Sequence, residues 1–285
     1  MREIASGVYF EDSFISGNIG CITSGEGAIL IDSPMVPRDA WSWLKRIASV
    51  TDQGIAFLIN TDYRIERVLG NCFFPTTATV AHEAAWSQMQ RYDHSFLQRY
   101  ISRQRQCFSG LASDLAKARI VLPELALTSD LTLHKGSRAL RVLHAGGHTP
   151  ASIMVHLPEE RILFTGDVVV VSQHPALDQA DTPQWLQALE AIRKMERVDV
   201  IVPGHGDLCT TDDTQALTDY ITAIRERVWE QFEAGLTRRE TVDKVRMDDF
   251  FTIPSDRRSL VERMIRSSVE RVYDEFKKGP PKRRQ

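Results

Sequence analysis

The sequence of 285 residues lacks long apolar runs and any marked excess of charge of one sign. No apolar run approaches the ~20 residues that a membrane-spanning helix needs. Residues Met1 to Gly7 also lack the apolar stretch of a secretory signal. Because the net charge is only −3 and both signs are mixed along the chain, charge gives no reason to expect binding to nucleic acid or to an anionic membrane surface. We therefore expect partners that include neither nucleic acid nor a membrane.

Cysteine is also scarce, and its spacing argues against two common uses. The four cysteines, Cys21, Cys72, Cys107 and Cys209, lie far apart and form no Cys-x-x-Cys pair. Such spacing is typical neither of a disulfide framework nor of a zinc knuckle. Reduced thiols without a secretory signal are typical of a cytoplasmic protein, and we expect that location.

The composition is otherwise that of an ordinary globular protein. A hydrophobic fraction of 42% is sufficient for a sizeable core. We expect a single α/β domain over residues 1–278. Residues 279–285 are rich in proline, lysine and arginine, and we predict that they form a disordered basic tail.

Apolar patterns predict strands and helices over most of the chain. Short apolar runs such as 55–59 are typical of buried strands, and residues 38–50 carry apolar side chains at helical spacing. Residues 83–119 are expected to form a mostly helical insertion, interrupted at Gly110. Two hairpins are expected between residues 131 and 165. Further helices are predicted at 183–195, 213–235, 237–245 and 255–277.

One stretch combines the end of a buried strand with an unusual set of charges. After the strand at 55–59 the chain reads Asn60-Thr61-Asp62-Tyr63-Arg64-Ile65-Glu66-Arg67-Val68-Leu69-Gly70-Asn71. This stretch resembles the metal-binding loop of the metallo-β-lactamase fold superfamily, which reads His-x-His-x-Asp-His between Asn-Thr and Val-Leu-Gly-Asn. The flanks match that loop here. The ligand positions, however, hold Asp62, Arg64, Glu66 and Arg67.

Three later segments resemble the same superfamily, and they occur in its order. They are Gly146-Gly147-His148-Thr149-Pro150, Leu163-Phe164-Thr165-Gly166-Asp167 and Val202-Pro203-Gly204-His205-Gly206. An ordered set of motifs at predicted strand ends is more specific than any one of them. The resemblance implies an αββα sandwich, with two mixed β-sheets face to face and helices on both outer faces. The local sequence is most similar to the glyoxalase-II-like and lactonase-like branches.

The resemblance also implies which positions would surround a pair of zinc ions. Carried over position by position, the first zinc site corresponds to Asp62, Arg64 and His148. The second corresponds to Glu66, Arg67 and His205, with Asp167 between the two. Only His148, Asp167 and His205 keep the residue that the family uses.

The two arginines argue against a zinc pair. A guanidinium group stays protonated and has no lone pair to give, so it cannot be a metal ligand. Two guanidinium groups would also repel a dication. We therefore expect no cofactor. The alternative is one divalent metal, which would be zinc, iron or manganese. Its candidate ligands are Glu66, Asp167, His205, His148 and Asp62.

The same two arginines predict an ion-paired centre. Carboxylates that face one another without a cation would repel and take up protons. Arg64 and Arg67 restore two of the positive charges that the metals would supply. We predict that they pair with carboxylates from among Asp62, Glu66 and Asp167. Tyr63 lies between two residues that face the site, so alternation predicts that it points into the core.

Two classes of function remain open. The first is a hydrolase-like enzyme acting on a small anionic ester, thioester or lactone, with one metal or with none. Without metal, Asp167 or His205 would be the general base, and Arg64 or Arg67 would stabilise an oxyanion. The second is a non-catalytic member that binds a small anionic molecule, with Arg64, Arg67 and His148 as binding residues, or a protein partner. A homo-oligomer is also expected, because the helices near 213–276 offer more apolar surface than one sheet face needs.

Overall fold

The computed structural model describes residues 1–107, 115 and 118–279, except for the side chains of residues 103–107. Within these residues the strands form one sheet of seven and one of five. In spatial order, the first sheet consists of β1 (Arg2–Ala5), β2 (Val8–Glu11), β3 (Ile19–Thr23), β4 (Ala28–Ile31), β5 (Ile55–Ile59), β6 (Thr76–His82) and β7 (Leu125–Leu127). The second consists of β12 (Val200–His205), β11 (Ile162–Val170), β10 (Ile153–Leu157), β9 (Arg138–His144) and β8 (Leu131–Lys135).

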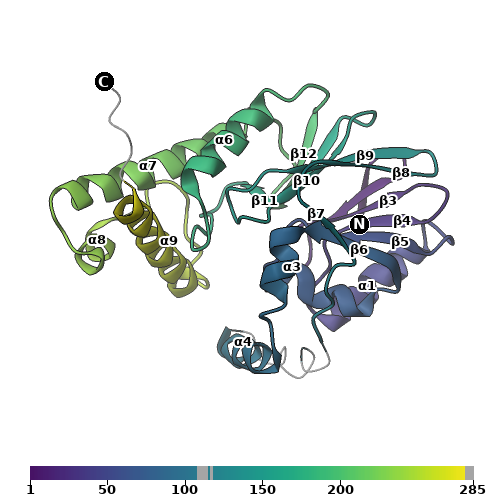
Figure 1. Cartoon of the computed structure of the whole chain (residues 1–285), viewed down its shortest axis with the longest axis horizontal. Helices are drawn as coiled ribbons and strands as arrows, with labels where there is room; N and C mark the ends of the chain where they lie inside the picture. Colours follow the sequence, from purple (N-terminus) through teal and green to yellow (C-terminus); the bar gives the residue numbers. More distant parts are fainter. Residues whose placement is uncertain (108–114, 116–117, 280–285) are drawn as a thin grey trace.

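Both sheets are mixed. The first four strands of the larger sheet pair antiparallel, and β4 to β7 pair parallel. In the smaller sheet only β11 and β12 are parallel. The two sheets lie face to face, with helices outside them (Figure 1). This confirms the predicted αββα sandwich.

The helices follow the apolar spacing of the sequence, with two short exceptions. Their bounds are α1 (Pro37–Ala48), α2 (Ile65–Val68), the 3₁₀ helix η1 (Leu69–Phe73), α3 (Glu83–Met89), α4 (His94–Cys107), α6 (Thr182–Arg193), α7 (Thr214–Glu233), α8 (Arg238–Lys244) and α9 (Arg258–Lys278). The predicted insertion at 83–119 contains α3 and α4. Its expected break at Gly110 lies outside the described residues, as does the predicted tail after Gly279.

The space between the sheets is filled by branched and aromatic side chains from both. Phe10, Ile29 and Ile59 of the larger sheet meet Val155 and Phe164 of the smaller one, and all are buried. The strand pattern explains this, because alternate side chains of each strand face the opposite sheet. Burying a large apolar side chain contributes about 1.5–3 kcal/mol, so this layer holds the two sheets together.

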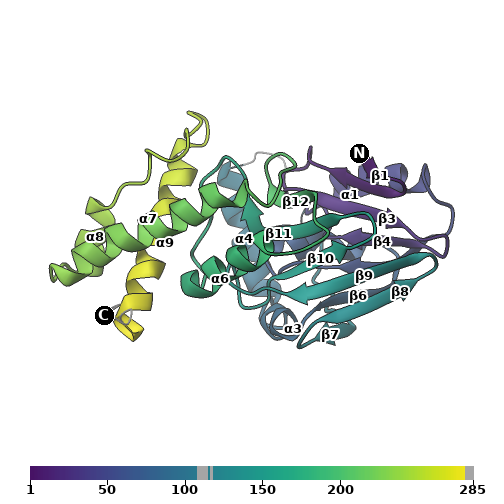
Figure 2. The same cartoon turned by 90° about the horizontal axis from the view of Figure 1, so that it is seen from above.

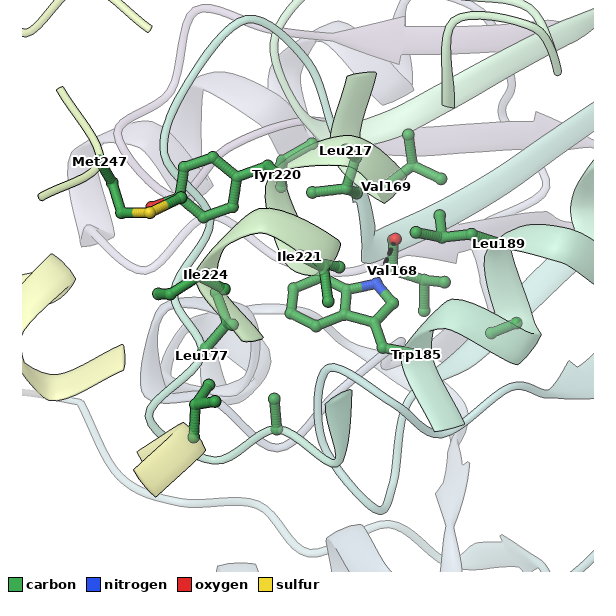
Figure 3. Close-up of a cluster of buried hydrophobic side chains, with 14 of the residues drawn as sticks. Val168, Val169, Leu177, Trp185, Leu189, Leu217, Tyr220, Ile221, Ile224 and Met247 are labelled. Carbon is green, nitrogen blue, oxygen red and sulfur yellow. Dashed lines mark hydrogen bonds between the residues drawn. The ribbon is translucent and has the colours of Figure 1, made fainter. Parts of the chain in front are cut away.

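The outer faces are covered by helices. On the larger sheet, α1 buries Trp43 and Ile47 against Leu30 and Leu58. On the smaller sheet, Trp185 of α6 packs against β11, and its indole N–H donates to the Val168 carbonyl at 2.8 Å. Figure 3 shows this indole beside Leu217, Ile221 and Ile224 of α7.

The last three helices extend beyond the ends of the sheets (Figure 2). They remain joined to the sandwich, because residues of α7 and α9 belong to the same buried cluster as β11 and α6. The assignment of residues 1–278 to one domain stays a prediction.

Cys21, Cys72 and Cys209 are free thiols, which agrees with the absence of a disulfide framework in the part described. Among the described helices, none combines the length and apolar character required to cross a bilayer.

Candidate functional site

The four motif segments meet at one end of the sandwich because each lies at or near the end of a strand. Asp62 lies three residues beyond β5, and His148 lies four residues beyond β9. Asp167 belongs to β11 and His205 is the last residue of β12, which pairs parallel with β11. Parallel strands bring equivalent ends to one edge of a sheet, so distant motifs become neighbours.

Arg67 is fully buried at the site, with 0% of its surface exposed. Its Nη2 donates to the Asp167 carboxylate and, at 2.9 Å, to the Gly204 carbonyl. Its Nη1 donates to the Asn18 carbonyl at 2.9 Å and lies 3.6 Å from an Asp32 oxygen. Burial alone would lower the pKa of Arg67, but the charges of Asp167 and Asp32 outweigh it and raise that pKa. The guanidinium is therefore a fixed cation.

The backbone leaves room for this pair at Gly204. A Cβ atom at that position would lie 2.0 Å from an Asp167 oxygen and 2.7 Å from the Arg67 Nη2. Both distances are far inside van der Waals contact. Glycine at 204 is thus required by the close approach of the ion pair.

Asp167 is held in its ionised form chiefly by the Arg67 guanidinium. Burial raises the pKa of Asp167, but the charges of Arg67, His205 and His148 outweigh burial and hold the pKa well below its ordinary value. The His205 Nε2 lies 3.5 Å from the same carboxylate, and a third of the His205 side chain is exposed. Burial lowers the pKa of His205, and the neighbouring Arg67 charge lowers it further against the opposing charge of Asp167.

Asp32 is a buried member of the site that the motifs did not indicate. It directly follows β4 and accepts hydrogen bonds from the Thr61 amide at 2.8 Å and the Thr61 hydroxyl at 2.6 Å. Burial raises the pKa of Asp32 to about 6, although Arg67 and Thr61 oppose the shift. The sequence feature that could have indicated Asp32 as a site residue is its position directly after a strongly apolar strand.

Asp62 and His148 form a second buried pair. The His148 Nδ1 lies 3.0 Å from Oδ2 of Asp62, which also accepts from the Thr149 and Ser152 hydroxyls at 3.0 and 3.1 Å. The backbone amides of Tyr63 and Arg64 donate to Oδ1 of Asp62. Burial raises the pKa of Asp62, but the hydrogen bond and charge of His148 outweigh it, so the pKa is lowered.

Arg64 lies nearer the surface and links two loops. Its Nε donates to Glu66 at 2.9 Å, and its Nη1 donates to Asp178 at 3.0 Å. It lines a pocket of about 290 Å³, together with Glu66, Phe96, Arg99, Tyr100, Asp178 and Gln179. No sequence motif marks Phe96, Arg99, Tyr100, Asp178 or Gln179 as pocket residues, so these five were not predicted.

The prediction of an ion-paired centre is confirmed for both arginines. Arg64 pairs with Glu66, and Arg67 pairs with Asp167. Tyr63 is buried in the core beside Val68 and Ala81, as alternation predicts. Asp62, the third predicted partner, instead accepts from a histidine and two hydroxyl groups.

The residues that would hold a metal do not fit one in this arrangement. Glu66 is turned to Arg64, and the Arg67 guanidinium donates directly to Asp167. In the part of the chain that the structure describes, no group of three or more His, Cys, Asp or Glu side chains is arranged to hold a metal ion. The proposed single site of Glu66, Asp167 and His205, with Asp62 and His148 nearby, is therefore not assembled. A fully buried cation occupies its centre.

Comparison with known sequences finds a match between residues 74–205 and the sequence model of the Metallo-beta-lactamase superfamily. A Metallo-beta-lactamase type 2 from Bacteroides fragilis is 33% identical over 105 residues, which are 35% of this chain and 42% of that protein. The Acyl-coenzyme A thioesterase MBLAC2 of Bos taurus is 30% identical over 93 residues, covering 31% of this chain and 33% of that protein. The matched stretches thus span less than half of each relative.

Comparison with solved structures shows the same fold over nearly the whole chain. A metallo-beta-lactamase family protein from Thermus thermophilus has a TM-score of 0.71 at 15% identity, covering 97% of this chain and 95% of that one. The inverting sec-alkylsulfatase Pisa1 from Pseudomonas sp. has a TM-score of 0.74 at 15% identity, covering 96% of this chain and 49% of that one. Identity at this level shows the fold alone.

Proposed function

We propose that this protein, which has the metallo-β-lactamase fold and an arginine where the resemblance places a metal ligand, is hydrolase-like, works without metal and binds a small anionic ester or thioester. The single observation that carries the proposal is the buried Arg67, which donates to Asp167 where a ligand would face a metal. A cation at the centre removes the electrostatic need for zinc. A metal would also have to displace a guanidinium that is enclosed on all sides.

The pocket beside this centre suits a small anion. Its volume of about 290 Å³ lies near the small end of the range of roughly 300–1,000 Å³ that is usual for ligand pockets. Arg64 and Arg99 supply positive charge beside the carboxylates of Glu66 and Asp178, which pair with Arg64, and the rings of Phe96 and Tyr100 supply apolar wall. Guanidinium groups bind carboxylate, phosphate and sulfate groups through paired hydrogen bonds.

The names of the matched proteins support an anionic ester or thioester. One relative is named as a thioesterase of acyl-coenzyme A, and one solved structure is that of an alkylsulfatase. Both named substrates join an apolar chain to an anionic group. A pocket with two arginines and two aromatic rings could accept such a molecule at its charged end.

The alternative is a non-catalytic protein that binds the same kind of anion as a signal. The pocket lining favours this alternative. The pocket lies beside the ion-paired residues, and Asp167 and His205 are not among the residues that line it. Turnover separates the two functions. A bound ester that is recovered intact after hours with the protein would support the binding module.

Metal content tests the first part of the proposal. The purified protein is loaded with excess zinc, desalted and measured by plasma mass spectrometry. We expect well under one equivalent. The matched control carries Asp62→His, Arg64→His, Glu66→Asp and Arg67→His, which together restore the family motif. It should retain zinc, because His148, Asp167 and His205 remain in place. Two tightly held equivalents of zinc in the unchanged protein would contradict the metal-free proposal.

Ligand binding tests the second part. Hexyl sulfate and acetyl-coenzyme A are titrated into the protein by calorimetry. Arg99→Gln should weaken binding about 10-fold or more, since a hydrogen bond to a charged group contributes about 1.5–3 kcal/mol. Arg38→Gln removes an exposed arginine outside the pocket and should leave the Kd unchanged. Equal affinities for both variants would count against this pocket.

A further inference from the structure

The pocket that Arg64 lines contains charges of both signs. Two of its lining residues are arginines and two are carboxylic acids, namely Arg64, Arg99, Glu66 and Asp178. They come from three segments of the chain: the N-terminal end of α2, the helix α4, and the loop between β11 and α6. A purely anionic ligand would be repelled by both carboxylates, and a purely cationic ligand would be repelled by both arginines. Neither kind of ion matches all four groups.

Negative charge is in excess around Arg64. Its Nε donates to Glu66 Oε1 at 2.9 Å, and its Nη1 donates to Asp178 Oδ1 at 3.0 Å, so one guanidinium serves two carboxylates. The second oxygen atoms of these carboxylates, Glu66 Oε2 and Asp178 Oδ2, have no hydrogen-bond partner among the described residues. An ionised carboxylate can accept through both of its oxygens. This side of the pocket therefore offers negative charge and open acceptor atoms to a cation.

Arg99 has the opposite character. In the part of the chain that the structure describes, it pairs with no carboxylate, and its one hydrogen bond runs from Nη1 to the Ser95 hydroxyl at 3.0 Å. Ser95 lies four positions earlier in α4. Because a guanidinium has five N–H donors, most of those of Arg99 remain open to a ligand. A sulfate, phosphate or carboxylate group would meet here a cation that no described carboxylate neutralises.

Two aromatic rings also line the pocket. Phe96 and Tyr100 lie three positions before and one position after Arg99, which is the spacing of one face of a helix. Phe96 is stacked on Tyr92, with ring centroids 4.5 Å apart, and the Tyr100 hydroxyl donates to the Met35 sulfur at 3.4 Å. Both rings are thereby held in place. The negative face of an aromatic ring attracts ammonium groups, and quaternary ammonium ligands are recognised in this way.

We infer that the pocket recognises a zwitterion, in which one small ester or thioester carries an ammonium group as well as an anionic group. The ammonium group lies against Glu66, Asp178 and the aromatic rings, and the anionic group binds Arg99. The inference rests on the proposed binding of an anionic ester or thioester in this pocket, and it narrows that ligand to molecules that also carry a positive charge. Such a ligand complements all four charged groups at once.

The volume of the pocket limits the size of this ligand. At about 290 Å³ the pocket lies near the small end of the usual range. It therefore suits a short molecule in which a few carbon atoms separate the two charged groups. Choline sulfate is a sulfate ester of this kind, because an ethyl chain joins its trimethylammonium group to its sulfate group.

A matched pair of ligands tests the role of the ammonium group in the unchanged protein. Choline sulfate is compared with neohexyl sulfate, which has the same shape but carries a carbon atom in place of the charged nitrogen. Each is titrated into the protein by calorimetry. We expect choline sulfate to bind about 10-fold more tightly, because it gains the attraction of two carboxylates and of the aromatic faces. Equal affinities, or tighter binding of neohexyl sulfate, would overturn the inference.

Asp178→Asn should move the two ligands in opposite directions. The substitution keeps the shape of the side chain and removes one of the two carboxylates that pair with Arg64. Choline sulfate should then bind about 3–10-fold more weakly, whereas neohexyl sulfate should bind more tightly because a repelling charge is gone. Asp199→Asn, which removes an exposed carboxylate outside the pocket, is the matched control and should change neither Kd. A change of both ligands in the same direction would contradict the inference.

Arg99→Gln separates this inference from the proposed binding of an anion. Both sulfates should bind this variant about 10-fold or more weakly, because both lose the same charge-assisted hydrogen bonds. If neohexyl sulfate binds and responds to Arg99→Gln while choline sulfate binds no more tightly, the zwitterion inference fails and the proposed anion binding stands. If neither sulfate binds the unchanged protein, both fail.

Discussion

The Arg67 guanidinium and the Asp167 carboxylate form a buried ion pair between residues that lie 100 positions apart. One partner comes from α2 beside the larger sheet, and the other from β11 of the smaller sheet. The pair therefore joins the two halves of the sandwich at the site. The carbonyl oxygens of Asn18 and Gly204 also accept from the guanidinium, whereas its buried Nε has no hydrogen-bond partner among the described residues.

Removing the cation of this pair should strongly destabilise the fold. Arg67→Met leaves Asp167 buried without a partner, which costs about 3–5 kcal/mol in comparable buried pairs. Urea denaturation followed by circular dichroism measures the change. The matched control is Arg161→Met, whose partner Asp199 is exposed, and it should cost less than about 1 kcal/mol. Equal losses in the two variants would mean that Arg67 is not essential to the centre.

Acid should weaken the same pair. The pKa of Asp167 is lowered in the folded protein, whereas an unfolded aspartate titrates near about 3.9. Its contribution to stability is thus fully present above about pH 4 and is lost as the pH falls through the lower folded value. We expect the free energy of unfolding to drop between about pH 4 and pH 2. In Asp167→Asn that drop should be smaller, which denaturant titrations at several pH values would show.

The pKa of Asp32 is shifted in the opposite direction to that of Asp167, so its effect on stability should have the opposite pH dependence. Its pKa is raised to about 6 in the folded protein. The folded state therefore holds this proton more tightly than the unfolded state, and the resulting stability is lost as the pH rises from about 4 to about 6. Asp32→Asn should reduce the change in the free energy of unfolding between about pH 4 and pH 6. The drop below about pH 4, which Asp167 causes, should remain. If Asp167→Asn and Asp32→Asn changed the free energy of unfolding in the same pH range, the two pKa directions would be misassigned.

The sequence predicted best those features of the site that depend on neighbouring residues in the chain. Each motif lies at or near the end of an apolar strand, so the placement of His148, Asp167 and His205 at one edge followed from strand order. Charge balance likewise predicted that Arg64 and Arg67 pair with carboxylates. Neither inference required knowing the distance between any two residues.

Contacts between distant segments could not be predicted in the same way. Asp178 pairs with Arg64 across 114 positions, and nothing near Asp178 marks it as a site residue. Asp62 was expected among the partners of an arginine, yet it accepts from His148 because the β9–β10 loop brings imidazole and hydroxyl groups to it. The helices at 65–73 were also missed, because four or five residues are too few for helical periodicity.

Gly204 should be intolerant of even one methyl group. Its Cβ would lie 2.0 Å from an Asp167 oxygen and 2.7 Å from the Arg67 Nη2, so Gly204→Ala must push the ion pair apart. We expect a loss of about 1–3 kcal/mol or more in the free energy of unfolding, as for other overpacked sites. Gly279→Ala is the control, since no atom of the described residues apart from its chain neighbours lies within 4 Å of the added Cβ. A neutral Gly204→Ala would show that the pair has space to move.

Asp178 should compete with an incoming anion for Arg64. It accepts from the Arg64 Nη1 at 3.0 Å, lines the same pocket and is 39% exposed, so its carboxylate repels a negative ligand and occupies a donor that the ligand needs. Asp178→Asn keeps the shape and removes the charge. We expect the Kd for hexyl sulfate to fall about 3–10-fold, because removing a like charge near the surface is worth about 1 kcal/mol. Asp199→Asn, which removes an exposed carboxylate outside the pocket, should leave the Kd unchanged. Weaker binding by Asp178→Asn would mean that Asp178 orients Arg64 for the ligand and does not oppose it.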